Sequence, residues 1–368
     1  MVSISDRVRA IVEAFAKRKV LISGSRSGDH LMNAAAPLKH PVPGTLRAAA
    51  GCLWEGTEPQ NAAALEILNA GQQVITPPVR DAVVQNLVSL FRGDYLLARL
   101  MLEEGRFMVF QAILCLSAAQ NPEDRDSWLT LGRLQARLSS SGLTSRNRIE
   151  ALVAIFERYG FIERRKAEED LRISILMPTA RMWSADALFT EMHLSPLCRE
   201  QGQEETSAGA SQLLARLSHG GEANGSSHQH ADPMAPAWSE RSIAPATAGH
   251  RNWRRSFAPL LQDYFGMRMQ HRSISALAER DGGYLTLLML LHEAAQTGSS
   301  RIQMGYESIS EHAGISRTHA RLLMEQAETL GLVQLHARGG RDIEVRQSAW
   351  DAMDSWLTGN FAYLLATV

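Results

Sequence analysis

The 368-residue sequence lacks an excess of either charge. Its 38 Lys and Arg residues are balanced by 39 Asp and Glu residues, which gives a formal net charge of −1. This balance excludes a histone-like protein that is basic over its whole surface. If the chain binds nucleic acid, its positive charge must be local. A globular protein without a polyanionic partner is the alternative.

Cysteine is scarce. Cys52, Cys115 and Cys198 are far apart, odd in number and without a C-x-x-C pair. Such spacing excludes a disulfide framework and a zinc site of paired cysteines. We expect reduced, structural thiols, and a redox sensor is the alternative, because a reactive thiol needs a nearby cation or helix N-terminus.

Long apolar runs are also missing. The longest, residues 107–119 and 284–291, are shorter than the roughly 20 residues that span a bilayer. Residues 1–19 include Asp6 and Glu13 and lack the apolar stretch of a signal peptide. We expect a cytoplasmic protein without a membrane segment.

Catalytic and metal-binding motifs are absent as well. His292 and Glu293 are not followed by the second histidine of a zinc protease, and no G-x-S-x-G occurs. His228 and His230 have no Cys or carboxylate at ligand spacing. We predict no enzyme, metal or other cofactor, although catalytic groups need only converge in space.

What the sequence does contain is a repeated stretch. Residues 145–160, SRNRIEALVAIFERYG, align without a gap with residues 316–331, SRTHARLLMEQAETLG. Each copy begins at a serine suited to cap a helix and ends at a glycine suited to stop one. The apolar residues recur at helical spacing, namely Ile149, Leu152, Val153 and Phe156, then Ala320, Leu323, Met324 and Ala327. Both stretches are predicted to be capped helices with one buried face.

The segments around each copy follow one order. A short helix with a polar turn comes before it, and two strand-like runs come after it. These segments are 132–144, 161–165 and 171–177 around the first copy, and 307–315, 332–337 and 342–346 around the second. Residues 128–131 are a candidate third strand. This order is typical of a winged helix-turn-helix, which places its second helix in the DNA major groove.

Composition suggests how the chain is divided. We predict an N-terminal arm at 1–60, partly disordered, and a first winged-helix domain at 61–199 in which Pro77-Pro78 interrupt the helical pattern. A flexible linker at 200–250, rich in Gly, Ser, Ala, His and Pro, precedes a second winged-helix domain at 251–368. The expected fold is mainly α with small β-hairpin wings. Flanking helices would pack the two domains as a pseudo-dimer.

The expected DNA contacts come from the exposed start of each repeated helix and from nearby cations. Arginine pairs with guanine, asparagine with adenine, and a capped helix N-terminus with phosphate. Glu150 and the three carboxylates of residues 166–170 oppose such binding. The predicted DNA-binding residues are Arg133, Arg137, Ser145, Arg146, Asn147, Arg148, Arg164, Arg165, Lys166, Ser316, Arg317, Thr318, His319, Arg321, Arg338 and Arg341.

Three segments resemble the MarR-type family of bacterial transcription regulators. They are GLTSRNRIEALVAIFERYGFIERR, MPTARMW and GISRTHARLLMEQAETLGLVQLHARGGRDIEV. The resemblance implies a homodimer on a near-palindromic operator, and in many members a small, often aromatic effector. This chain differs because it holds two modules. One chain would then imitate the dimer, as a monomer or within a homodimer, and its two unlike reading helices do not require a palindrome.

We therefore expect a sequence-specific, double-stranded DNA-binding transcription regulator whose two reading helices lie roughly 34 Å apart. Three alternatives stay open. An enzyme would need a closed polar pocket, which the sequence does not show. A plasmid-type replication initiator also carries tandem winged helices and would bind repeated sites at an origin. A winged-helix protein–protein interaction module would fit the neutral charge, and would be favoured if other parts of the chain covered Arg146 and Arg317.

Overall fold

A computed structural model describes residues 75–92, 94–139, 145–199, 204–218 and 246–367. All of them belong to one compact unit, Gly71–Val368. The predicted arm at 1–60 lies outside the described residues.

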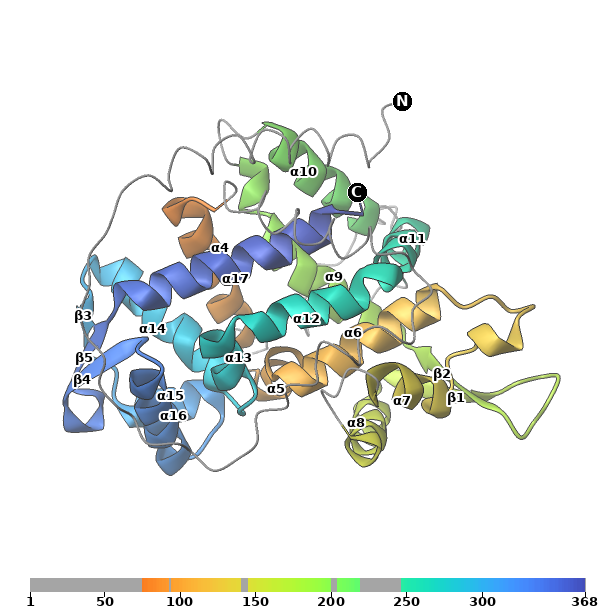
Figure 1. Ribbon diagram of the computed structural model, residues 1–368, viewed down its shortest axis with the longest axis horizontal. Coiled ribbons are helices and arrows are strands. Elements are labelled where there is room, and N and C mark those ends of the chain that lie inside the picture. Colours follow the sequence, from red (N-terminus) through yellow and green to blue (C-terminus); the bar gives the residue numbers. More distant parts are fainter. Residues whose placement is uncertain (1–74, 93, 140–144, 200–203, 219–245, 368) are drawn as a thin grey trace, which may run out of the picture. The chain divides into compact units, whose positions relative to one another are not determined.

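The described chain is mainly helical and carries two small antiparallel sheets, as predicted (Figure 1). The first half contains α4 (Pro77–Phe91), α5 (Tyr95–Leu102), α6 (Glu104–Ala118), α7 (Leu131–Ser139), α8 (Arg146–Arg158), β1 (Ile162–Lys166), β2 (Ser174–Pro178), α9 (Ala180–Leu194) and α10 (Glu204–Ser218). The second contains α11 (Ala248–Phe257), α12 (Leu261–Gln270), α13 (Arg272–Ala278), α14 (Gly283–Thr297), β3 (Arg301–Ile302), α15 (Tyr306–Ala313), α16 (Arg317–Thr329), β4 (Val333–Ala337), β5 (Asp342–Val345) and α17 (Gln347–Leu365). Four short 3-10 segments occur at Arg125–Ser127, Leu197–Arg199, Ala258–Leu260 and Arg338–Gly340.

The two repeated helices form as their local sequence predicts. The Ser145 side chain accepts the backbone N–H of Arg148, and the Ser316 side chain accepts that of His319. Gly160 and Gly331 follow the helices with φ of 70° and 73°, a conformation that glycine adopts without a Cβ clash. The apolar positions of both helices are buried. The predicted caps, stops and core faces are confirmed.

Each repeated helix is followed by a hairpin. β1 pairs with β2 in antiparallel register, from Ile162 opposite Pro178 to Lys166 opposite Ser174. In the second half β5 lies between β3 and β4. In place of the expected third strand, the first sheet has a single bridge between Thr130 and Ile175. The two hairpins thus occupy equivalent places after α8 and α16.

The first helix of each half packs against the other half. Helix α4 lies against α14, and α11 lies reciprocally against α6. On α4, the Arg80 guanidinium lies 4.3 Å from the ring centroid of Trp350 on α17 and pairs with Asp354. On α11, Arg254 pairs with Asp186 of α9. Such reciprocal exchange is the packing that two-fold-related subunits show.

The core around α6 positions α8. The rings of Phe110, Phe156 and Phe161 meet edge to face, with centroids 5.9 to 6.2 Å apart. All three side chains are fully buried. Edge-to-face pairs contribute beyond their buried area, so the inner face of α8 is firmly seated on α6 and on the start of the first hairpin.

The predicted break at Pro77-Pro78 coincides with the start of α4, where the missing N–H of proline costs nothing and Thr76 supplies the cap. The part of the predicted helical pattern before residue 75 lies outside the described residues. One predicted boundary, that of the linker, is wrong. The predicted linker contains α10, which buries Ala210, Leu213 and Leu217 against its neighbours, and α11 begins at Ala248. These three side chains recur at helical spacing. The many Gly, Ser and Ala residues around them favour a linker, and this is why the sequence alone did not indicate the helix. The other parts of the predicted linker, 200–203 and 219–245, lie outside the described residues.

Among the described residues, no helix combines the length and apolar character that a bilayer crossing requires.

The turn between α15 and α16 depends on Gly314. Its φ is 63°, and a Cβ there would lie 2.5 Å from the Tyr95 ring. We expect Gly314→Ala to lower the free energy of unfolding by about 1–3 kcal/mol, measured by urea denaturation. Gly298→Ala is the matched control, because Gly298 has φ of 62° with nothing within 4 Å. An equal loss in both variants would show that the Tyr95 contact is unimportant.

Candidate nucleic-acid interface

The starts of α8 and α16 are uncovered by the described part of the chain. In α8, Arg146, Asn147, Glu150 and Ala151 are exposed. In α16, the exposed side chains at the same positions are Arg317, Thr318, Arg321 and Leu322. The opposite face of each helix is buried, so these side chains are the ones available to a partner. The described residues do not cover Arg146 or Arg317.

Two of the predicted contacts, Arg148 and His319, are engaged inside the protein. The Arg148 Nη2 lies 2.7 Å from Oε1 of Glu103, whose side chain is only 4% exposed. The His319 Nε2 lies 3.0 Å from the backbone oxygen of Asp281. These are aligned positions of the two copies. Both residues therefore anchor their helix to the N-terminus of the preceding buried helix, α6 or α14.

Four of the other predicted arginines have carboxylate partners. Arg164 lies 2.9 Å from Glu157, Arg165 lies 3.5 Å from Glu163, and Arg321 lies 2.5 Å from Glu325. Arg317 pairs with Glu307. The side chains of these pairs are mostly exposed, where an ion pair contributes about 0–1 kcal/mol. A phosphate can therefore compete for them, but the local positive potential is small.

Arg133 and Arg137 lie one turn apart on α7. Burial, together with repulsion from Arg133, lowers the pKa of Arg137. The Nη1 of Arg133 is buried and has no hydrogen-bond partner among the described residues. An anion beside these two guanidinium groups would relieve their repulsion. This is the position from which the predicted phosphate contact would be made.

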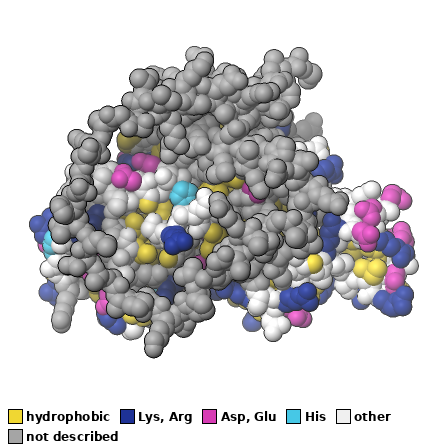
Figure 2. Space-filling view, in the orientation of Figure 1, with side chains coloured by type: hydrophobic (Ala, Val, Ile, Leu, Met, Phe, Trp, Pro, Cys, Tyr) yellow, Lys and Arg dark blue, Asp and Glu magenta, His cyan; other side chains and the backbone are white. Residues whose placement is uncertain are grey.

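The two hairpins differ in charge. Near the first, Arg125 pairs with Glu169 and Arg172 with Asp170, and Lys166 is exposed. Acidic and basic side chains alternate at the right of Figure 2, where Figure 1 places this hairpin. The second turn is compact, because Gly339 and Gly340 have φ of 77° and 74°, and Arg341 is exposed. The Arg338 side chain lies outside the described part. The second hairpin is the better candidate for a minor-groove approach.

A buried polar junction, which the sequence analysis missed, joins the two halves. Asp186 of α9 is fully buried and receives Arg254, His250 and Gln111, with the Arg254 Nε at 2.7 Å and the His250 Nε2 at 2.8 Å. Burial alone would raise the pKa of Asp186, but Arg254 and His250 outweigh it and hold the pKa at about 2. The carboxylate is therefore charged, and it ties α9 to α11.

A second buried pair lies beside the first. Arg268 of α12 donates two hydrogen bonds of 2.7 Å to Glu104 of α6. The Oδ1 of Asn360 accepts from Arg268 at 2.9 Å and from the Tyr264 hydroxyl at 2.6 Å. The pair thus joins α6 of the first half to α12 and α17 of the second. Figure 1 shows α12 and α17 side by side.

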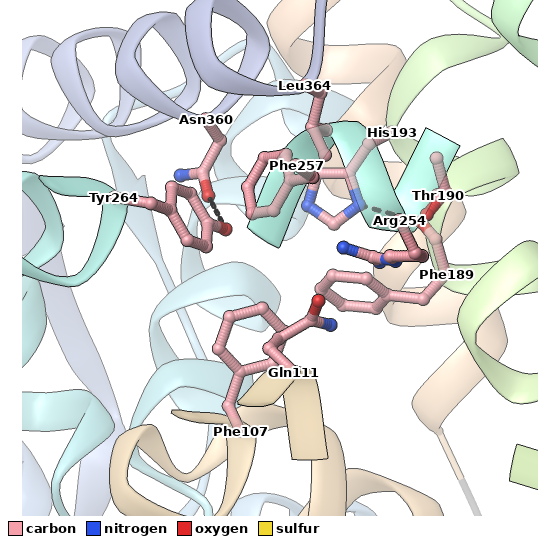
Figure 3. Close-up of a pocket in the computed structure, with 10 residues that line it drawn as sticks. All are labelled: Phe107, Gln111, Phe189, Thr190, His193, Arg254, Phe257, Tyr264, Asn360 and Leu364. Carbon is pink, nitrogen blue, oxygen red and sulfur yellow. Dashed lines mark hydrogen bonds between the residues drawn. The ribbon is translucent and has the colours of Figure 1, made fainter. Parts of the chain in front are cut away.

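A small cavity is lined by Arg254 of the first pair and by Tyr264 and Asn360, which contact Arg268 of the second pair (Figure 3). Phe107, Phe189 and Phe257 form apolar walls, and the Thr190 hydroxyl has no hydrogen-bond partner among the described residues. The free volume is about 10 Å³, enough for one water molecule. The junction is therefore a packed polar core, and not an open ligand site.

One signal for this junction was present in the sequence. His250, Trp253, Arg254 and Phe257 recur at i, i+3, i+4 and i+7 and share the buried face of α11. Charged residues within an apolar stripe indicate buried ion pairs. Their partner on α9, Asp186, is not identifiable from local sequence.

Comparisons with protein-family models, curated proteins and solved structures gave no match. Among the described residues, no group of three His, Cys, Asp or Glu side chains is placed to hold a metal ion. The resemblance to MarR-type regulators stays a prediction.

Proposed function

We propose that this chain is a sequence-specific, double-stranded DNA-binding regulator of transcription. One chain would supply two non-identical winged helix-turn-helix modules, arranged as a pseudo-dimer. The observation that carries the proposal is that α8 and α16 hold equivalent places in two interlocked halves and both expose their first turn. An exposed, serine-capped helix start is the part of such a module that enters the major groove.

Equivalence of the halves extends past the hairpins. The Thr179 hydroxyl donates to the carbonyl of Gly160 at 2.7 Å, and the Ser348 hydroxyl donates to the carbonyl of Gly331 at 2.5 Å. In each half a hydroxyl at the start of the helix after the hairpin therefore holds the end of the proposed reading helix. Together with the reciprocal packing of α4 and α11, this supports an internal duplication.

The charge distribution supports binding of modest strength. Arg146, Lys166 and Arg341 are exposed and have no carboxylate partner within the described ranges. Each phosphate contact that such cations make releases counterions, so affinity falls as salt rises. Because few of the described cations beside the two helix starts and hairpins are unpaired, the loss with salt should be smaller than for a strongly basic protein. Specificity would come from Arg146, Asn147, Arg317 and Thr318 at the base edges.

We expect Arg146→Ala and Arg317→Ala each to weaken binding to a preferred duplex by roughly 1–3 kcal/mol. The duplex is first selected from a randomised library with the full-length protein, and affinity is then measured by fluorescence anisotropy. Arg158→Ala is the control, because Arg158 is exposed at the far end of α8 and should leave affinity unchanged. If neither first-turn substitution weakens binding, these residues do not read the DNA.

A winged-helix protein-interaction module is the second candidate. It is favoured by the carboxylate partners of Arg164, Arg165, Arg317 and Arg321, which reduce attraction to phosphate. Ile155, Tyr159 and Leu322 are also exposed on the repeated helices or just after one of them. Failure of the full-length protein to enrich any duplex, at low salt, would favour this candidate.

A further inference from the structure

A continuous chain of polar contacts joins the two reading helices. Arg148 of α8 lies 2.7 Å from Oε1 of Glu103, and Oε2 of Glu103 lies 3.6 Å from Nε of Arg106. The Arg106 Nη1 lies 2.5 Å from Oδ1 of Asp281. The backbone oxygen of Asp281 lies 3.0 Å from the His319 Nε2 of α16. We call these five residues the relay.

The relay is held rigidly on the first half. Glu103 caps α6, accepting the N–H of Gly105 at 3.3 Å and of Arg106 at 3.0 Å. Its carboxylate is buried, where charges interact more strongly than in water. A Cβ on Gly105 would lie 2.9 Å from the Arg148 Nη2, so the Arg148 guanidinium lies close against the backbone of α6.

The relay is also held on the second half. Asp281 precedes Gly282, which has the left-handed conformation and is the N-cap residue of α14. Helix α5 of the first half braces the second helix-turn-helix beside it. The Tyr95 hydroxyl donates to the Glu311 carbonyl at 2.6 Å, and Arg99 donates to the Gly314 carbonyl at 3.0 Å. The two reading helices are thus connected through short, directional contacts near their N-termini.

We infer that Glu103, Arg106 and Asp281 are positioning residues that set the separation of the two reading helices, and thereby the half-site spacing that the protein accepts. This inference rests on the proposed function. One base pair changes the distance between half-sites by about 3.4 Å and rotates one against the other. A rigid connection engages both half-sites at one spacing only, whereas a loose one tolerates several.

The Arg106–Asp281 pair is the link to test, because both side chains are partly exposed and the pair crosses between the halves. Arg106→Glu and Asp281→Arg each remove the attraction and create a like-charge contact. The double variant exchanges the charges and should restore this pair, but the carboxylate that it places at position 106 repels Glu103, so the relay recovers only in part. Asp351→Arg on α17 is the control, because it makes the same charge change at an exposed side chain outside the relay.

The first measurement uses no DNA. Spin labels are placed at Arg158→Cys and Thr329→Cys, exposed aligned positions of α8 and α16, with Cys52 and Cys198 replaced by Ser. Pulsed electron–electron double resonance gives the distance distribution. We expect one narrow distribution in the wild type and the control, a broader one in each single variant, and one of intermediate width in the double variant.

The second measurement uses the duplex selected by the wild type, with the distance between half-sites changed one base pair at a time. We expect the wild type and the control to lose about tenfold or more in affinity one base pair from the optimum. Each single variant should lose less than about threefold there, and its affinity for an isolated half-site should be unchanged. The double variant should lose more than either single variant at that spacing, because the Arg106–Asp281 attraction is restored.

The outcomes separate this inference from the proposed function. Single variants that keep the wild-type distance distribution and spacing profile overturn the inference and leave DNA binding intact. A broader distribution without a change in spacing profile also overturns it, because the relay then does not govern recognition. If the wild type enriches no duplex, the proposed function fails and the spacing role fails with it, while the distance measurement still decides whether the relay fixes the two helices.

Discussion

Replacing Arg254 with methionine is expected to lower the free energy of unfolding by about 3–5 kcal/mol. Asp186 is fully buried and its carboxylate is charged, since Arg254 and His250 outweigh the effect of burial on its pKa. Methionine keeps much of the apolar volume but leaves this charge with only His250 and Gln111. Removing one member of a buried pair costs more than the pair contributes, because the other charge stays buried.

Urea denaturation of the full chain, followed by circular dichroism, measures this effect. The double variant Arg254→Met with Asp186→Leu should recover most of the loss, because an apolar replacement of both partners leaves no unpaired charge. Arg301→Ala is the control. It removes an exposed pair with Asp342 and should cost less than about 1 kcal/mol. If Arg254→Met lowers the free energy of unfolding by less than the control does, the buried junction does not stabilise the fold.

Acid should destabilise the protein through His193. Burial lowers the pKa of His193 to about 4, from an ordinary value of about 6.5. The unfolded chain therefore takes up a proton at a higher pH than the folded chain. The contribution of neutral His193 to the free energy of unfolding is fully present above about pH 6.5. It falls by about 3 kcal/mol in total as the pH is lowered to about 4.

His193→Leu tests this prediction, because leucine fills the site and does not titrate. Urea denaturation at a series of pH values should give a steep fall in the wild type between about pH 6.5 and pH 4, and a flatter curve in the variant. Cys198→Ser, a neighbouring change that adds no titrating group in this range, should keep the wild-type slope. If the slope of His193→Leu equals that of the wild type, another group controls the acid response.

The parts of the fold that depend on local sequence could be predicted. Helices α8 and α16 form where the serine caps, the apolar stripes and the terminal glycines indicate, because each of these signals acts within a few residues. The hairpins follow for the same reason. Arg148 shows the limit, because its partner Glu103 is 45 residues away and nothing local distinguishes an anchored arginine from an exposed one.

The pairing of the halves could not be predicted from local patterns. An apolar stripe on α4 does not say that α14 will cover it. The buried pairs Asp186–Arg254 and Glu104–Arg268 form only when helices from both halves are brought together. Burying four charges is costly unless each finds its partner, so this junction favours one register of packing over others.

The most direct test is a hydroxyl-radical footprint of the full-length protein on its selected duplex, at a protein concentration that gives one chain per duplex. The account predicts two protected segments about one helical turn apart, centred on two unlike half-sites. Arg146→Ala should weaken protection of one segment and Arg317→Ala that of the other. A footprint with a single protected segment would show that the chain does not place two reading helices on one stretch of DNA. Two segments whose protection both substitutions weaken equally would show the same.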